Sequence, residues 1–324
     1  MRGLKLAATR GIADHTAAMN SEMLRRCSRI VCWPLLLLAA ALPTPPAFAA
    51  AAAANCAVNC PAPAPTMAPV PKPPAVPRYL LASQIDLIGL LPPPPAADSP
   101  AQQADLQAVL EAQRAARADG TLAHAVADAE ANCGRFSDVL GDALTSTANP
   151  RLLAFLNQAA REGASIAGPA KQYWKRTRPY AYSSEVEPLG DMSPDWKAVP
   201  RMDTGGRAMA DMKNGANDLA HSSYPSGHAT FGTVCAILLA DMVPEKREAL
   251  FARSRDFAHS RLVVGAHFPT DLAAGQIAGT LAAQLLLQNV SFRRDLAEAR
   301  SNLRVALGLP AEAPDLEPEP AYTK

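Results

Sequence analysis

Three clusters of polar residues in this chain have types and spacings suited to binding an oxyanion. The first runs from Lys171 to Pro179, with Arg178 seven positions after Lys171. This spacing predicts that both cations lie on the same face of a helix two turns apart, where they could bind one anion together. Arginine would offer its planar fork of donors to the anion's oxygens. Because Lys175 and Arg176 lie between them, a solvated basic helix face is the alternative interpretation.

The second cluster is the run Tyr224-Pro225-Ser226-Gly227-His228, directly ahead of an apolar segment. A Pro-Ser-Gly helix start leaves free backbone N–H groups in the first turn, where an anion binds readily. Ser226 can add a hydroxyl donor, and Gly227 lets the backbone approach a ligand closely. His228 is placed to deliver a proton to a leaving group. Taken alone, the run favours the alternative of a plain helix cap beside a surface histidine.

The third cluster joins Ser260 and Arg261 to His267 and Asp271. The spacing predicts that Arg261 lies late in one helix and that His267 lies in the turn after it. Asp271 would then fall in the first turn of the next helix, which Pro269 opens. There it could accept a hydrogen bond from the imidazole and expose the other ring nitrogen. The alternative is that Asp271 serves only as a negative charge on the helix dipole.

Together the three clusters supply the parts of a phosphoryl-transfer site. Such a site needs charge neutralisation, a nucleophile and an acid for the leaving group. His267 is the predicted nucleophile, Asp271 its orienting carboxylate, and His228 the proton donor. Lys171, Arg178 and Arg261 are the three cations, and Ser226 and Gly227 belong to the expected helix N-terminus.

The segments that must position these residues have helical patterns. Alanine accounts for much of the 49% hydrophobic content and aromatic residues make up only 5%, a composition that favours helices. Because no sustained strand alternation and no repeat occurs, we predict a single, compact all-α domain. The expected helices cover 100–118, 120–147, 151–167, a restart carrying Lys171, 229–243, 244–264 and 269–289, with a long loop over 180–224 that is expected to be functional.

The N-terminal residues 1–49 have the pattern of a secretory signal peptide. A basic cluster at Arg25, Arg26 and Arg29 precedes a short apolar run, and Ala49 ends a small-x-small cleavage site. Met23 is an alternative start, and a retained membrane anchor is the alternative interpretation. We predict an Ala/Pro-rich linker over 50–78, a folded domain over 79–308 and a disordered tail over 309–324. Export would place the protein in the periplasm or outside the cell.

Charge and hydropathy exclude two classes of partner. A net charge of +1 with 19% charged residues offers no basic surface for nucleic acid. The two most apolar helices, 229–243 and 272–290, are interrupted by Asp241 and by glutamines. Neither reaches the run of about eighteen apolar residues that crosses a bilayer, so we predict no stable membrane insertion after signal cleavage.

Four cysteines would remain in the exported chain, and their pairing is open at this point. Cys56 and Cys60 lie in the Ala/Pro-rich tract, where they could pair locally or between chains. Cys133 and Cys235 lie in apolar helical segments, where a buried free thiol is as compatible with the pattern as a bridge.

The joint pattern of the three clusters resembles the signature of the type 2 phosphatidic acid phosphatase superfamily, which also contains vanadium haloperoxidases. The pattern is Lys171-x6-Arg178-Pro179, Pro225-Ser226-Gly227-His228 and Ser260-Arg261-x5-His267-x3-Asp271. Over about residues 79–290, the chain is similar to the class A bacterial nonspecific acid phosphatases. Outside the signature, the run from Leu90 to Pro95 and the residues before Pro225 add to this resemblance.

The resemblance implies an all-helical acid phosphatase that hydrolyses a broad range of small phosphate monoesters. It implies that His267 forms a phosphohistidine, and that His228 protonates the leaving alcohol and then activates water. It also implies the residues that hold the phosphate oxygens: Lys171, Arg178, Ser226, Gly227 and Arg261. No metal or other cofactor would be needed, since cationic side chains take the place that a divalent ion fills elsewhere. By the same resemblance, the chain could assemble as a homo-oligomer.

Three other functions fit parts of the same pattern. A lipid phosphate phosphatase would act at a membrane, and a vanadate-dependent haloperoxidase would hold vanadate in the same anion site. A phosphate-binding or scaffold protein on a decayed enzyme fold would lack some of the reactive residues, whereas all of them are present here. Turnover of p-nitrophenyl phosphate, tested against a halide- and peroxide-dependent assay with vanadate, separates these functions.

Overall fold

The computed structural model describes residues 77–193 and 219–314, and throughout these residues the secondary structure is helical, without a strand. The α-helices are α1 (Leu87–Leu90), α2 (Pro100–Asp119), α3 (Leu122–Ala127), α4 (Ser137–Leu140), α5 (Pro150–Ser165), α6 (Ala167–Trp174), α7 (Pro179–Tyr182), α9 (Gly227–Met242), α10 (Arg247–Val263), α11 (Pro269–Gln288) and α12 (Val290–Ala306). Five 3₁₀ turns join them: η1 (Ala82–Gln84), η2 (Cys133–Phe136), η3 (Gly141–Leu144), η4 (Gly190–Met192) and η6 (Pro244–Lys246). The all-α prediction is confirmed.

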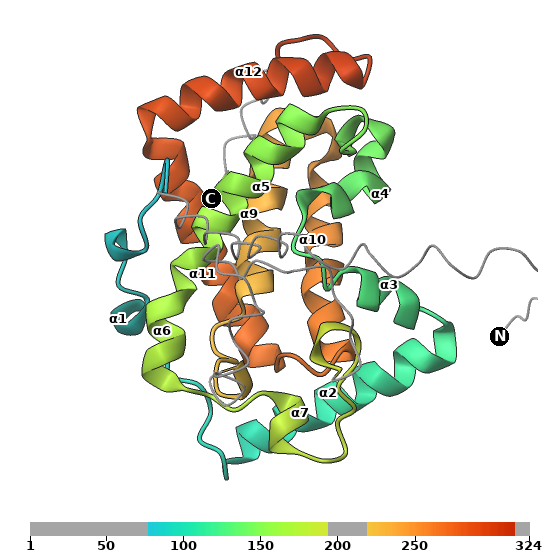
Figure 1. Ribbon diagram of the computed structural model, residues 1–324, viewed down its shortest axis with the longest axis vertical. Helices are drawn as coiled ribbons and strands as arrows, with labels where there is room; N and C mark the ends of the chain where they lie inside the picture. Colours follow the sequence, from blue (N-terminus) through green and yellow to red (C-terminus); the bar gives the residue numbers. More distant parts are fainter. Residues whose placement is uncertain (1–76, 194–218, 315–324) are drawn as a thin grey trace, which may run out of the picture. The chain divides into compact units, whose positions relative to one another are not determined.

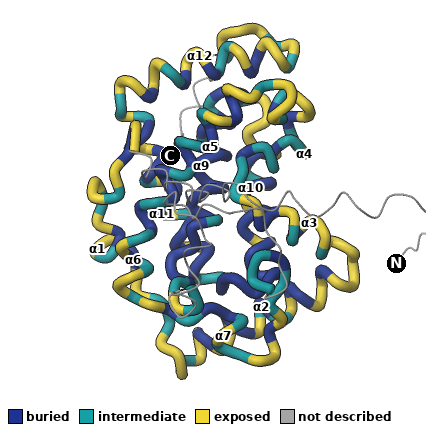
Figure 2. Tube along the Cα trace, viewed as in Figure 1, coloured by how far each residue is buried: buried dark blue, intermediate teal, exposed yellow. Residues whose placement is uncertain are grey.

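Helix α9 lies at the centre of the described domain (Figure 1). It packs against α5, α10 and α11, and nearly all of its residues are buried (Figure 2). A helix that is apolar on every side needs neighbours all round it, which explains why the most hydrophobic helix became the central one. The second cluster lies at the N-terminus of this helix, so the core itself holds that end in place.

Helices α9 and α11 approach closely because glycines face α9. A Cβ on Gly275 would lie 2.4 Å from the carbonyl oxygen of Ser226, and one on Gly279 would lie 2.7 Å from that of Thr230. At the same end, the Ser226 N–H donates to the carbonyl of Asp271 at 3.0 Å. Because these glycines have no Cβ, the second and third clusters can come into direct backbone contact.

Two sequence expectations about helices were wrong. Residues 120–147 form α3, η2, α4 and η3 instead of one helix, because the backbone is extended at Asn132 and leaves the helical region at Gly141, whose φ of +63° suits glycine. Helix α12 was not predicted, although its buried face packs on α11 and α5. Other predicted helices match closely: 100–118 corresponds to α2, 151–167 to α5 and 269–289 to α11.

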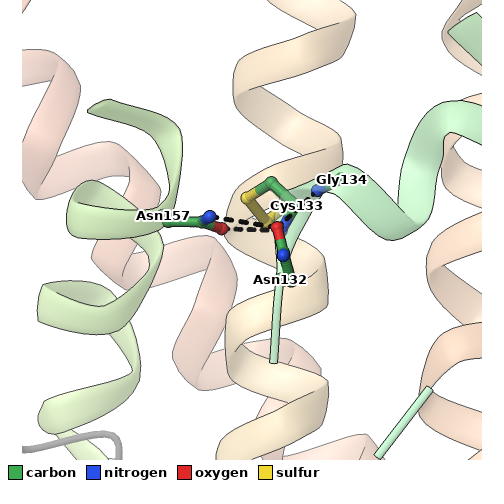
Figure 3. Close-up of a disulfide and its surroundings, with 5 residues drawn as sticks. Asn132, Cys133, Gly134 and Asn157 are labelled. Carbon is green, nitrogen blue, oxygen red and sulfur yellow. Dashed lines mark hydrogen bonds between the residues drawn. A yellow bond between two sulfur atoms is a disulfide. The ribbon is translucent and has the colours of Figure 1, made fainter. Parts of the chain in front are cut away.

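A disulfide between Cys133 and Cys235 joins η2 to the middle of α9 (Figure 3). Both cysteines are fully buried. Asn157 of α5 accepts from the Cys133 N–H at 2.7 Å and donates to Asn132 at 3.0 Å, which holds the bridge against a third element. The question that the sequence left open is therefore decided in favour of a bridge for this pair.

Several predicted segments lie outside the described residues. These are the signal peptide, Cys56, Cys60 and nearly all of the linker, the loop residues 194–218 and the last ten residues of the predicted tail. Within the part that is described, Leu309 and Pro310 still hydrogen-bond to Arg304 of α12. No helix in that part combines the length and the apolar character needed to span a bilayer.

Candidate active site

Lys171 and Arg178 meet, but not on one helix as the sequence predicted. Helix α6 ends at Trp174, and Lys175 adopts a left-handed conformation with φ +47°. Arg178 follows in an extended conformation, because it precedes Pro179 and the proline ring disfavours the helical region for the residue before it. A turn after α6, and not helical periodicity, therefore places Arg178 near Lys171.

The carbonyl of Ser222 holds the two cations side by side. Lys171 Nζ donates to this oxygen at 2.5 Å, and Arg178 Nη2 donates to it at 3.3 Å. Arg178 also donates through Nη1 to the carbonyl of Ala266 at 2.9 Å and lies 3.2 Å from Nε2 of His267. The first cluster thus reaches the loop before α9 and the turn after α10.

The N-terminus of α9 presents Ser226, Gly227 and His228. Ser226 caps the helix by accepting from the Ala229 N–H at 3.2 Å, and its own hydroxyl hydrogen is left to donate. His228 Nε2 lies 3.0 Å from the carbonyl of Ala129, so Nε2 carries a hydrogen and Nδ1 is the nitrogen that can transfer a proton. The His228 ring stacks on Phe257 with centroids 5.8 Å apart, which fixes its plane.

Arg261 lies in the last turn of α10 with only 1% of its surface exposed. Its Nη2 forms an ion pair with Asp191 of η4 at 2.8 Å. Its Nε and Nη1 atoms are buried and have no hydrogen-bond partner among residues 77–193 and 219–314. These two donors are available to a bound oxyanion.

His267 lies in the turn between α10 and α11, as expected, and Asp271 lies in the first turn of α11. Arg178 can only donate to Nε2, so Nε2 is the unprotonated nitrogen and Nδ1 carries the hydrogen. Nδ1 is 3.6 Å from Asp271 Oδ2, which is too long for a hydrogen bond but suits an electrostatic contact. The Oδ2 atom accepts from the Ser223 hydroxyl at 2.6 Å and from the Phe268 N–H at 2.8 Å.

The site is strongly electropositive, and the pKa values of its groups reflect this. Burial, followed by Arg178, Lys171, Arg261 and His228, holds the pKa of His267 well below its usual value. Burial and then Arg261 lower the pKa of His228 to about 3. Burial and then Arg261 lower the pKa of Arg178 to about 10, and burial and then Arg178 lower that of Lys171. A bound anion would raise the pKa of each of these groups, because its negative charge stabilises their protonated forms.

Two charged residues at the site were not predicted from the sequence. Arg176, which entered the sequence analysis only through the alternative of a solvated basic face, is buried and forms an ion pair with Asp271. Because proline disfavours the helical region for the residue before it, Pro179 indicates that the helix ends before Arg178. That signal could have shown that Arg176 need not lie on an exposed helix face. Asp191 lies far from every motif in the sequence, and no pattern pointed to it. In the described part of the chain, no three His, Cys, Asp or Glu side chains group as a metal site requires, and the expected metal independence stays a prediction.

Comparisons with known proteins identify the class to which this fold and site belong. The PAP2 superfamily model matches residues 152–295, a range that contains all three clusters. A non-specific acid phosphatase of Salmonella typhimurium is 30% identical over 218 residues, covering 66% of this chain and 78% of the relative. An acid phosphatase of Zymomonas mobilis is 30% identical over 220 residues, covering 67% and 75%. One from Providencia stuartii, also a non-specific acid phosphatase, is 28% identical over 228 residues, covering 68% and 83%.

The chain belongs to the PAP2 superfamily, and within it to the class A bacterial acid phosphatases. These relatives favour neither a haloperoxidase nor a lipid phosphatase.

Proposed function

We propose that this enzyme hydrolyses phosphate monoesters through a phosphohistidine on His267. One observation carries the proposal: Nε2 of a buried, neutral His267 lies 3.2 Å from Arg178, in the field of Lys171, Arg178 and Arg261. A nucleophile surrounded by cations favours an anionic electrophile, and phosphate oxygens fit the donors of these residues. Ser226 and Gly227 at the N-terminus of α9 would complete the phosphate cradle.

The proposed reaction has two displacement steps. In the first, the Nε2 lone pair of His267 attacks phosphorus, the P–O bond to the alcohol breaks, and Nδ1 of His228 gives the leaving oxygen its proton. The positive charge that develops on His267 is stabilised by the Asp271 carboxylate beside Nδ1. In the second step, His228 takes a proton from water, the water oxygen attacks phosphorus, and the P–N bond breaks to release phosphate.

The charge of the substrate explains how His228 can hold its proton. In this structure, burial and the nearby Arg261 lower the pKa of His228 to about 3. A bound phosphate brings negative charge to Arg261 and Arg178, and the pKa of His228 then rises. His267 must stay unprotonated at Nε2, and burial among the cations maintains this in acid. Both requirements are compatible with an acidic optimum.

We further propose a broad range of small phosphate monoesters, no metal requirement, and a periplasmic or secreted location. The named relatives act as non-specific acid phosphatases, which supports the substrate range. The Cys133–Cys235 disulfide supports an oxidising compartment. The signal-peptide pattern of residues 1–49 agrees with export.

The decisive experiment compares wild type with His267→Ala on p-nitrophenyl phosphate in the presence of EDTA. Wild type is expected to turn over, and rapid quenching during turnover should trap an alkali-stable phosphoenzyme. His267→Ala should lose turnover by at least about 1,000-fold, since the nucleophile is gone, and should still bind vanadate through the remaining cations.

The mechanism is wrong if His267→Ala keeps substantial turnover or if the trapped phosphate lies on another residue. A requirement for an added divalent cation in wild type would contradict the cationic site. His259→Ala is the matched control, because that histidine lies on α10 and outside the proposed site.

A further inference from the structure

Arg176 is a buried arginine whose guanidinium joins the third cluster to helix α2. It is 8% exposed, and its Cζ atom lies 4.4 Å from the centroid of the Phe268 ring. Nη1 donates to Asp271 Oδ1 at 2.6 Å and to Thr270 at 2.6 Å. Nη2 donates to Gln102 and to Asp105 of α2 at 2.5 and 2.7 Å. An arginine with this many short bonds has essentially one position.

Asp271 in turn accepts hydrogen bonds through both carboxylate oxygens near the nucleophile. Arg176 binds Oδ1, while Ser223 and Phe268 bind Oδ2, the oxygen 3.6 Å from His267 Nδ1. Asp271 is fully buried, and a buried carboxylate stays ionised only when cations and hydrogen-bond donors compensate for the lost water. Among these three partners, Arg176 is the only one that carries a charge.

We propose that Arg176 is a positioning residue for the nucleophile: it holds the Asp271 carboxylate beside Nδ1 of His267 and offsets part of its negative charge. This inference rests on the proposed role of His267. Arg176 would not touch the substrate, since Nη1 and Nη2 both donate to protein side chains. Its Nε is buried as well and has no hydrogen-bond partner among the described residues.

Offsetting the charge matters because Asp271 has two opposing effects on His267. It stabilises the cation that forms on phosphorylation, but an uncompensated carboxylate would also favour protonation of Nε2 before substrate arrives. Several charged and titratable groups of the described residues act on His267 or Asp271. They are Lys171 of α6, Arg176 and Arg178 of the turn after it, Tyr224 before α9, His228 at the start of α9 and Arg261 of α10. Asp105 of α2 pairs with Arg176, and Asp191 of η4 pairs with Arg261.

The proposal is tested by the pH dependence of kcat/KM, which reports the protonation of the free enzyme. In Arg176→Gln, Asp271 loses its cation and the pKa of His267 rises, so the acid limb of the profile should move to higher pH. Each unit of displacement lowers kcat/KM about tenfold on that limb. Loss of alignment should lower kcat up to about 100-fold at every pH, with little change in KM.

Two further variants separate this role from a merely structural one. Arg176→Lys keeps the charge but not the fork, so the acid limb should return toward the wild-type position while kcat stays reduced. Asp105→Asn removes the anion behind Arg176, which then offsets more of the Asp271 charge, and the limb should move to lower pH. These two variants also decide the question if Arg176→Gln does not fold.

Arg304→Gln is the matched control, since Arg304 is also buried and ion-paired, with Glu245, but lies on α12. It should lose thermal stability without any displacement of the acid limb. In the Asp271→Asn background, Arg176→Gln should change the limb little, because the carboxylate through which it acts is gone.

An acid limb that stays at the wild-type pH in Arg176→Gln, or that moves to higher pH in Asp105→Asn, overturns the proposal. The outcome is distinguishable from a failure of the proposed function. If wild type forms a phosphoenzyme on His267 while the limb does not respond to Arg176, only the positioning role is wrong. If no phosphohistidine forms in wild type, the proposed function itself fails.

Discussion

At the scale of single residues, the site holds neutral histidines beside buried cations. This arrangement couples the uptake of protons to the binding of anions. His228 has a pKa of about 3, lowered by burial and then by Arg261. In the unfolded chain its pKa would be near 6.5. Between these values the unfolded state binds more protons than the folded state, so stability falls as the pH falls through this window. A bound anion reduces this loss of stability, because it raises the pKa of His228 in the folded form.

We therefore expect sulfate, which stays doubly charged in mild acid, to bind more tightly as the pH falls through the raised pKa that His228 has in the complex. A rise of one unit in the pKa of His228 on binding would add about 1.4 kcal/mol, or tenfold in affinity, at a pH below both values. Calorimetric titration in buffers of different ionisation enthalpy counts the protons taken up. His228→Asn should take up fewer protons and lose most of the pH dependence. Equal proton uptake in both proteins would show that His228 is not the coupled group.

At the scale of helices, the contact between α9 and α11 decides the geometry of the site. Gly275 lies against the carbonyl of Ser226, and the Ser226 N–H donates to the carbonyl of Asp271. The N-terminus of α9, with the proposed proton donor, is thereby fixed relative to the turn that carries the nucleophile. Backbone atoms cannot retreat as a flexible side chain can, so little adjustment is available at this contact.

Gly275→Ala should therefore separate the two halves of the site. Its Cβ would lie 2.4 Å from a backbone oxygen and 2.8 Å from the Ala229 Cβ, so the helices must move apart. We expect a loss of about 1–3 kcal/mol in stability and a fall in kcat up to about 100-fold. Chemical denaturation and steady-state kinetics measure the two effects.

Gly168→Ala is the matched control, because a Cβ there meets no atom within 4 Å. This substitution should leave kcat near the wild-type value, while Pro169 disfavours a residue with a Cβ in the helical region before it and limits any gain in stability. The close-contact explanation is contradicted if Gly275→Ala has near wild-type kcat and stability.

At the scale of the whole molecule, the Cys133–Cys235 bridge connects segments 102 positions apart in the sequence. It ties η2 to the central helix, beside the Asn157 bond from α5. Closing a loop of this length restricts the unfolded chain by up to about 4.7 kcal/mol in the chain-entropy model. The bridge therefore stabilises the scaffold without belonging to the phosphate site.

Replacing both cysteines, as Cys133→Ala with Cys235→Ala, should lower the free energy of unfolding by about 2–5 kcal/mol. The kcat of the folded enzyme should change little, since neither cysteine contacts the proposed site residues. Urea unfolding of wild type with and without a reductant provides the comparison. An unchanged urea midpoint after verified reduction would show that the bridge contributes no stability.

The sequence by itself was sufficient to predict the all-helical class, to locate the three clusters and to recognise the family. These features are local: alanine content and periodicity favour helices, while a proline, a glycine or a histidine at a set spacing needs no distant partner to be recognised. The positions of His267 and Asp271 around the start of α11 were predictable because Pro269 marks a helix start.

Only the tertiary structure decided which groups meet across the domain. Lys171 and Arg178 converge on the Ser222 carbonyl because a left-handed residue and a proline redirect the chain, and not because they share a helix face. Burial of Arg176 against Asp105 and Asp271 depends on how α2, α6 and α11 pack. The physical reason is that desolvation and ion pairing act between atoms close in space, whereas sequence patterns record only neighbours along the chain.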